Sequence, residues 1–167
     1  MLGGPVMVVR VTRVALFALV ATAADRPSNP YIDRGACPFE CCLYREWFAS
    51  KPLAVVDRPE GRRVVARLRE GERVTALTGE TRSIPLPMKS PVGDSEAGIH
   101  QGDRIYVLHY EGEGMWAVWF RGKRADAELS NLKVAPKTEW WAKIRTARGV
   151  VGWVRAERNF QNQDGCG

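Results

Sequence analysis

Residues 140–154 read WWAKIRTARGVVGWV, two short alternating segments joined through a glycine. A period of two is typical of a β-strand, in which neighbouring side chains point to opposite faces of a sheet. One face of the first segment carries Trp140, Ala142 and Ile144, and the other carries Trp141, Lys143 and Arg145. We expect the charged face to meet solvent. Gly149 and Gly152 allow a tight turn and a close backbone approach before Trp153-Val154 returns as the next strand, so the stretch predicts a β-hairpin.

The same pattern extends toward the N-terminus. From residue 53 onward, short alternating segments are separated by glycine and proline, and only Arg124 to Leu132 has a spacing compatible with a helix. A Gly-acid-Arg sequence followed by a β-branched residue occurs at Gly71 and again 31 residues later at Gly102. The recurrence indicates a repeated structural unit in a mainly β protein.

Four segments resemble the bacterial SH3-like (SH3b) domain family, whose pattern is an opening strand, then L-x-x-G-x-x-V, W-x-K-V and G-x-x-G-W-V. They are Leu53-Ala54-Val55 with Pro59, Leu68-x-x-Gly71-x-x-Val74, Trp141-Ala142-Lys143-Ile144, and Gly149-x-x-Gly152-Trp153-Val154. The chain departs from the family between Gly79 and Glu139, where about sixty residues stand in place of a short turn. Within this insertion, Gly102-x-x-Ile105 and Trp116-x-x-Trp119 resemble the middle of a second SH3-like unit, with a proline-rich opening at Ile84 to Val92.

The resemblance implies two small SH3-like barrels, the second nested in a loop of the first. The expected organisation is a Cys-rich segment at 24–50, a first barrel at 51–80 plus 136–160, and an inserted unit at 81–135. A single barrel with a long inserted hairpin is the alternative, because the insertion has no G-x-x-G-W-V motif of its own.

The N-terminus has the layout of a secretory signal peptide. Arg10 and Arg13 precede the apolar run Val14 to Ala21, and small residues at Ala21 and Ala23 predict cleavage before Ala24. The apolar run has eight residues, whereas a membrane-spanning helix needs about 20, so we expect residues 1–23 to be removed and no membrane span to remain. The protein is therefore expected to be secreted or periplasmic in a bacterium.

Four cysteines stand near the two ends of the expected mature chain, at Cys37, Cys41, Cys42 and Cys166. An exported protein favours disulfides, and the adjacent pair is excluded because neighbouring Cα atoms are only about 3.8 Å apart. Either Cys37 pairs with Cys41 and Cys42 with Cys166, or Cys37 pairs with Cys42 and Cys41 with Cys166. Both pairings tie the C-terminus to the N-terminal segment. Zinc is not expected, since the spacing lacks two C-x-x-C pairs and has no nearby histidine.

Composition narrows the function. Without residues 1–23 the chain has 23 basic and 19 acidic residues with no run of like charge, which disfavours nucleic acid as a partner. His100 and His109 lack an identifiable orienting group, so the sequence predicts no enzyme activity and no cofactor.

Binding is the role that the family resemblance implies. Its expected ligand is a cell-wall polymer or an envelope protein. An aromatic wall of Trp141, Trp153 and Tyr110 is the expected contact surface, with Lys143 and Arg145 pairing ligand carboxylates. A structural envelope protein without a small ligand and a cysteine hydrolase are the alternatives.

Overall fold

The computed structural model describes residues 25–130 and 132–166, and in these ranges it contains twelve β-strands and no helix. The mainly β prediction is therefore confirmed. The helical spacing at Arg124 to Leu132 was misleading, because Lys123–Glu128 forms strand β9. The predicted signal peptide at 1–23 lies outside the described residues. Within them, no helix long and apolar enough to cross a bilayer occurs.

Eight strands form a curled sheet in the order β12-β2-β5-β10-β11-β3-β4, with β1 pairing β5 beside β2. Their bounds are β1 Tyr31–Arg34, β2 Glu46–Ala49, β3 Leu53–Val56, β4 Val64–Leu68, β5 Arg73–Ser83, β10 Thr138–Thr146, β11 Val151–Arg155 and β12 Phe160–Gln161. The Cys-rich segment at 24–50 thus supplies two strands of this sheet. Strand β5 also continues to Ser83, beyond the expected boundary at residue 80.

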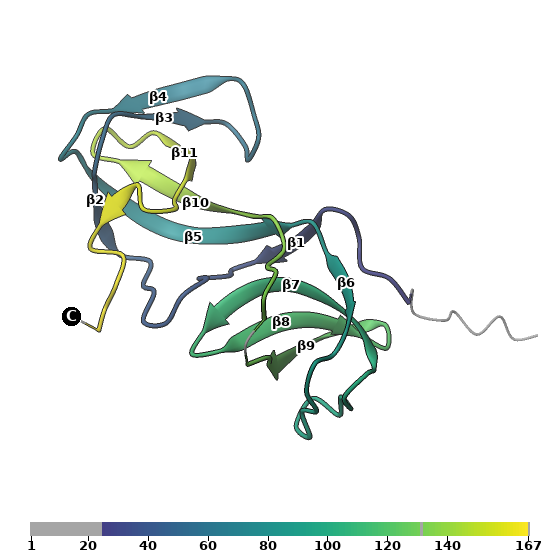
Figure 1. The fold of residues 1–167 in the computed structure, drawn as a ribbon. Helices are drawn as coiled ribbons and strands as arrows, with labels where there is room; N and C mark the ends of the chain where they lie inside the picture. Colours follow the sequence, from purple (N-terminus) through teal and green to yellow (C-terminus); the bar gives the residue numbers. More distant parts are fainter. Residues whose placement is uncertain (1–24, 131, 167) are drawn as a thin grey trace, which may run out of the picture.

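Between β5 and β10 the chain forms a second, four-stranded antiparallel sheet in the order β6-β7-β8-β9. These strands are β6 Leu86–Lys89, β7 Arg104–Gly112, β8 Met115–Phe120 and β9 Lys123–Glu128. Strands β5 and β10 then pair from Val74↔Thr146 to Ser83↔Thr138, as Figure 1 shows. The four-stranded sheet is open, because β6 and β9 are its two outer strands and do not pair within the described ranges, so the nesting of a second barrel stays a prediction.

The hairpin predicted at residues 140–154 is present as β10 and β11, with Lys143 opposite Trp153 and Trp141 opposite Arg155. Trp140, Ala142 and Ile144 are all buried, as expected. The opposite face, which carries Trp141, Lys143 and Arg145, is not uniformly exposed to solvent, since Trp141 is only 8% exposed. Strand β10 lies in the middle of the curled sheet, between β5 and β11, and the indole N–H of Trp141 donates to the Glu139 carboxylate.

The two sheets have separate apolar cores. The first core is rich in aromatic rings: Trp47 lies 5.7 Å from Trp140 and 5.4 Å from Phe160, centroid to centroid. The second core is aliphatic around Ile105, Val107 and Val118 of the four-stranded sheet. Each sheet therefore buries one of its faces in a core of its own, and the two sheets meet in a separate region.

Disulfides join Cys37 to Cys42 and Cys41 to Cys166, which is the second of the two pairings that the sequence left open. The first bond closes the short loop that carries Phe39, and the ring of Phe39 packs against the first core. The second bond connects residues 125 positions apart and holds the C-terminal segment against this loop.

Candidate ligand cleft between the two sheets

A cleft of about 380 Å³ lies where the two sheets approach one another. Strand β5 contacts β7, and Figure 1 shows β1 between these two strands. The lining comes from five parts of the chain: Pro38 and Phe39 from the disulfide loop, Thr81 from β5, His109 and Tyr110 from β7, Thr138 and Trp140 from β10, and Glu157, Arg158 and Gln163 from the C-terminal segment. The cleft thus exists only when both sheets and the disulfide loop are assembled.

Aromatic rings form its apolar wall. Phe39 meets Trp140 edge to face, with centroids 5.6 Å apart and planes at 83°. Tyr110 is 41% exposed and packs its ring against Trp116 at 5.1 Å. Edge-to-face pairs are favourable and hold ring orientation, so the wall is rigid before any ligand arrives.

Two hydrogen bonds hold Trp140 in position. Its indole N–H donates to the Tyr44 hydroxyl at 3.2 Å, and its backbone N–H donates to Glu157 Oε1 at 2.7 Å. The Tyr44 hydroxyl in turn donates to the carbonyl of Ala36. Burial raises the pKa of Tyr44, so this hydroxyl keeps its proton and both of its roles.

One buried polar atom in the cleft has no partner. Thr81 is 1% exposed, and its Oγ1 makes no hydrogen bond with any described residue. A buried hydroxyl left unpaired costs about 1–3 kcal/mol, and buried polar groups in folded proteins nearly always have a partner. Thr81 thus contributes to the cleft lining a buried hydroxyl whose hydrogen-bonding capacity is unused.

Charges of both signs stand at the cleft mouth. The Glu157 carboxylate is half-buried and lies 3.6 Å from Arg155 Nε, while the side chain of Arg158 is exposed and makes no ion pair within the described ranges. Gln163 is 8% exposed and donates from Nε2 to the carbonyl of Ala156. The cleft therefore offers an apolar wall together with a hydroxyl, an amide and two opposite charges.

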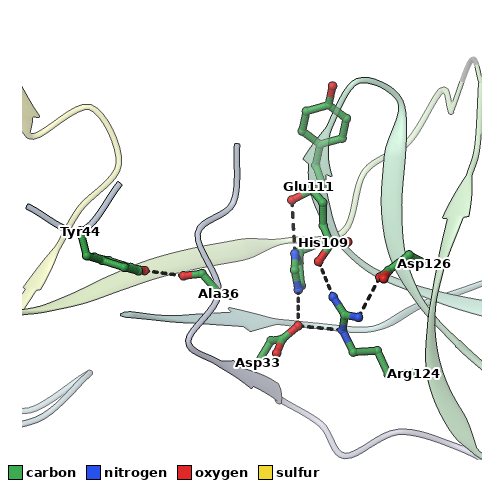
Figure 2. A network of polar contacts seen from close by, with 8 residues as sticks. Asp33, Ala36, Tyr44, His109, Glu111, Arg124 and Asp126 are labelled. Atoms are coloured by element: carbon green, nitrogen blue, oxygen red, sulfur yellow. Dashed lines mark hydrogen bonds and ion pairs between the residues drawn. The ribbon is translucent and has the colours of Figure 1, made fainter. Parts of the chain in front are cut away.

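A polar network under the cleft connects β1 to the four-stranded sheet, as Figure 2 shows. His109 is 1% exposed; its Nε2 lies 2.9 Å from Asp33 Oδ2 and its Nδ1 lies 3.2 Å from the carbonyl oxygen of Tyr110. Arg124 donates to Asp33 at 2.9 Å, to Asp126 at 2.8 Å and to Glu111. One guanidinium therefore holds three carboxylates from three different strands.

The network shifts the acidity of its members. The hydrogen bond from His109, assisted by the charge of Arg124, lowers the pKa of Asp33 against the opposing effect of burial. Burial, together with a hydrogen bond to Asp126, raises the pKa of Glu111. Although burial disfavours the charged guanidinium, the neighbouring carboxylates raise the pKa of Arg124, so it stays cationic.

This arrangement does not suit a metal ion or a general base. Ligand atoms of Asp33, His109 and Glu111 lie within 4.8 Å of one another, but Arg124 already supplies the positive charge that their carboxylates need. Both ring nitrogens of His109 face acceptors, so neither is free to take a proton from a nucleophile. The chemistry available here is structural.

The structure distributes the five predicted binding residues over two places. Tyr110 lines the cleft, to which Trp140 rather than Trp141 or Trp153 contributes the tryptophan ring. Trp153 is half-buried beside Lys143 across the β10–β11 pair. Trp141 donates its indole N–H to Glu139 at 3.1 Å and presents little ring surface.

Arg145 is exposed opposite Val151. A single wall of Trp141, Trp153 and Tyr110 is therefore not formed, because Tyr110 belongs to the other sheet. A binding role for the patch on β10 and β11 stays a prediction.

Comparisons of this protein with family models, with curated proteins and with solved structures give no match.

Proposed function

We propose that this chain is an exported, non-enzymatic binding module of SH3-like type, and that the cleft between its sheets holds a short peptide segment of a cell-envelope component. The observation that carries the proposal is the unpaired, buried Thr81 hydroxyl beside the aromatic wall of Phe39, Trp140 and Tyr110. An apolar wall with a few convergent polar groups is the usual composition of a ligand site.

A peptide suits this lining better than a purely apolar ligand. Its backbone supplies both donors and acceptors for the Thr81 hydroxyl and the Gln163 amide, while Glu157 and Arg158 at the mouth match charges of either sign. SH3-like domains hold extended peptides against aromatic walls, which agrees with this use.

The SH3-like part of the proposal is supported by where the family motif residues lie. Leu68 and Val74 flank the turn at Gly71 and are both buried in the first core. Gly152 lies so close to β3 that an added Cβ would stand 2.6 Å from Val55 Cγ1. The closing glycine therefore has the packing role that the G-x-x-G-W-V motif implies.

Export and the absence of catalysis are supported by the cysteines. All four form disulfides, which fits an oxidising compartment. A cysteine hydrolase needs a free thiolate next to a base, and His109 uses both ring nitrogens within its own network.

The test is co-sedimentation of the protein with purified peptidoglycan sacculi, using a variant that fills the cleft. Thr138 lies on β10 with its side chain exposed at the cleft, so Thr138→Trp narrows the cleft without removing a buried contact. We expect affinity for sacculi to fall at least about tenfold, equivalent to about 1.4 kcal/mol.

Thr75→Trp is the matched control, because Thr75 is also an exposed strand threonine but lies outside the cleft lining. This control should sediment like the wild type. Equal sedimentation of Thr138→Trp and the wild type, or no sedimentation of the wild type, contradicts the proposal.

A further inference from the structure

We infer that a second groove, at the far end of the curled sheet, binds a linear polymer that carries phosphate groups. This groove has a volume of about 490 Å³ and is lined by Arg67, Arg69 and Arg148 together with apolar residues. Arg67 and Arg69 lie at the end of β4, and Arg148 lies in the turn between β10 and β11. The inference does not depend on the peptide cleft, with which the groove shares no lining residue.

The three guanidinium groups of the groove have no carboxylate partner among the described residues. All three arginines are exposed, none makes an ion pair within residues 25–130 and 132–166, and no carboxylate lines the groove. Elsewhere in the chain Arg82, Arg124 and Arg155 each hold two or more carboxylates. The groove therefore presents three guanidinium groups without an ion-pair partner in the described part of the chain, and the carboxylate of nearby Glu72 accepts a hydrogen bond from the Arg69 backbone N–H at 3.0 Å instead.

Charge is also unevenly distributed between the two sheets. Residues 51–69, which contain the β3–β4 hairpin, have six basic and two acidic residues, whereas residues 84–130, which contain the four-stranded sheet, have five basic and seven acidic residues. A charged polymer is guided by such an uneven field toward the positive end. The net charge of +4 for residues 24–167 (23 basic minus 19 acidic) conceals this separation.

Phosphate is the anion that arginine recognises best, because the planar guanidinium donates two parallel hydrogen bonds to it. A lipid surface is a poorer fit. Proteins that lie on membranes combine basic residues with apolar side chains that insert into the bilayer, and none of the exposed large apolar residues of the described chain lines this groove.

The experiment titrates fluorescently labelled long-chain inorganic polyphosphate with the full protein, by anisotropy, over a series of salt concentrations. Each phosphate contact steepens the plot of log affinity against log salt concentration by about 0.7, so three contacts predict a slope of about −2. This slope corresponds to roughly 20-fold weaker binding at 200 mM than at 50 mM salt. The triple variant Arg67→Gln/Arg69→Gln/Arg148→Gln should lose this slope. Arg148→Gln alone should reduce it by about 0.7 and serves if the triple variant does not fold.

The matched control is Arg26→Gln/Arg34→Gln/Arg104→Gln, which removes the same charge from exposed arginines outside both the groove and residues 51–69. It should keep the wild-type slope. The inference is overturned if both triple variants lose affinity equally, if the wild type does not bind polyphosphate, or if anionic phospholipid vesicles bind in an arginine-dependent way and polyphosphate does not.

Discussion

Gly79→Ala should destabilise the protein strongly, although the substitution adds a single methyl group. Gly79 lies on β5 under the side chain of Tyr44, and an added Cβ would stand 2.1 Å from the Tyr44 hydroxyl oxygen. It would also lie 2.9 Å from Trp140 Nε1 and 2.9 Å from the carbonyl oxygen of Trp141. Tyr44 cannot move away freely, because its hydroxyl donates to Ala36 and accepts from Trp140.

The magnitude follows from these contacts. Overpacking a filled core costs about 1–3 kcal/mol, and displacing the hydroxyl removes two hydrogen bonds of about 1 kcal/mol each. Alanine recovers about 0.4–1 kcal/mol by restricting the unfolded chain. The expected loss in the free energy of unfolding is therefore about 3 kcal/mol, the sum of these generic terms.

The assay is urea unfolding with the disulfides intact, followed by tryptophan fluorescence. Tyr44→Phe removes the oxygen that the new Cβ would meet, and by itself should cost about 2 kcal/mol through its two hydrogen bonds. In the double variant this loss is not counted twice and the closest collision is absent, so its destabilisation should be smaller than the sum of the single variants by about 2 kcal/mol. Additive single effects, within about 0.5 kcal/mol, would refute this packing argument.

Three further outcomes are expected. Gly152→Ala should lower the free energy of unfolding in urea by about 2–3 kcal/mol, because the added Cβ would press on β3. Gly149→Ala, at φ +82° in open space, should lower it by only about 1 kcal/mol. Equal losses for the two variants would contradict the close approach of Gly152 to β3. Asp33→Asn should lower stability by about 2 kcal/mol at pH 7. Because the pKa of Asp33 is lowered in the folded protein, its carboxylate contributes stability above the unfolded pKa near 3.9, and this contribution disappears as pH falls through the folded pKa. A stability difference between the wild type and Asp33→Asn that stays constant down to pH 2 would refute this assignment. Removing the long disulfide by Cys41→Ser/Cys166→Ser should destabilise by up to about 5 kcal/mol on the chain-entropy account, measured by thermal unfolding, and a loss below about 1 kcal/mol would show that the bond does not restrict the unfolded chain.

Local alternation was sufficient to predict the β10–β11 hairpin, because each side chain's face depends only on its parity along the strand. It could not predict β1 and β2. Each has four residues, too few to show a period. Both pair with β5 over long stretches of sequence, since Tyr31↔Ser83 joins residues 52 positions apart and Glu46↔Thr75 residues 29 positions apart. Strand β2 also pairs with β12. Loop closure over such distances is decided by tertiary contacts that no local pattern records.

The cleft was missed for a related reason. The inward direction of Trp140 was predicted correctly, but its neighbours Phe39 and Tyr110 come from segments about 100 and 30 residues distant in the sequence. Alternation assigns a side chain to a face and does not say which element covers that face. The burial of Trp141 has the same explanation: alternation places it on the face opposite Trp140 but does not tell whether that face is covered.

The strand β1 explains why two sheets with separate cores keep a defined cleft between them. Its backbone pairs with β5 from Tyr31↔Ser83 to Arg34↔Glu80, while the side chains of Tyr31 and Asp33 reach the other sheet. Tyr31 meets Trp119 at 6.1 Å, and the Asp33 carboxylate accepts hydrogen bonds from β7 and β9. Since the β1–β5 backbone pairing is rigid and the Asp33 contacts are directional, one short strand fixes both the distance and the orientation of the sheets. The width of the cleft is therefore set by residues that do not line it.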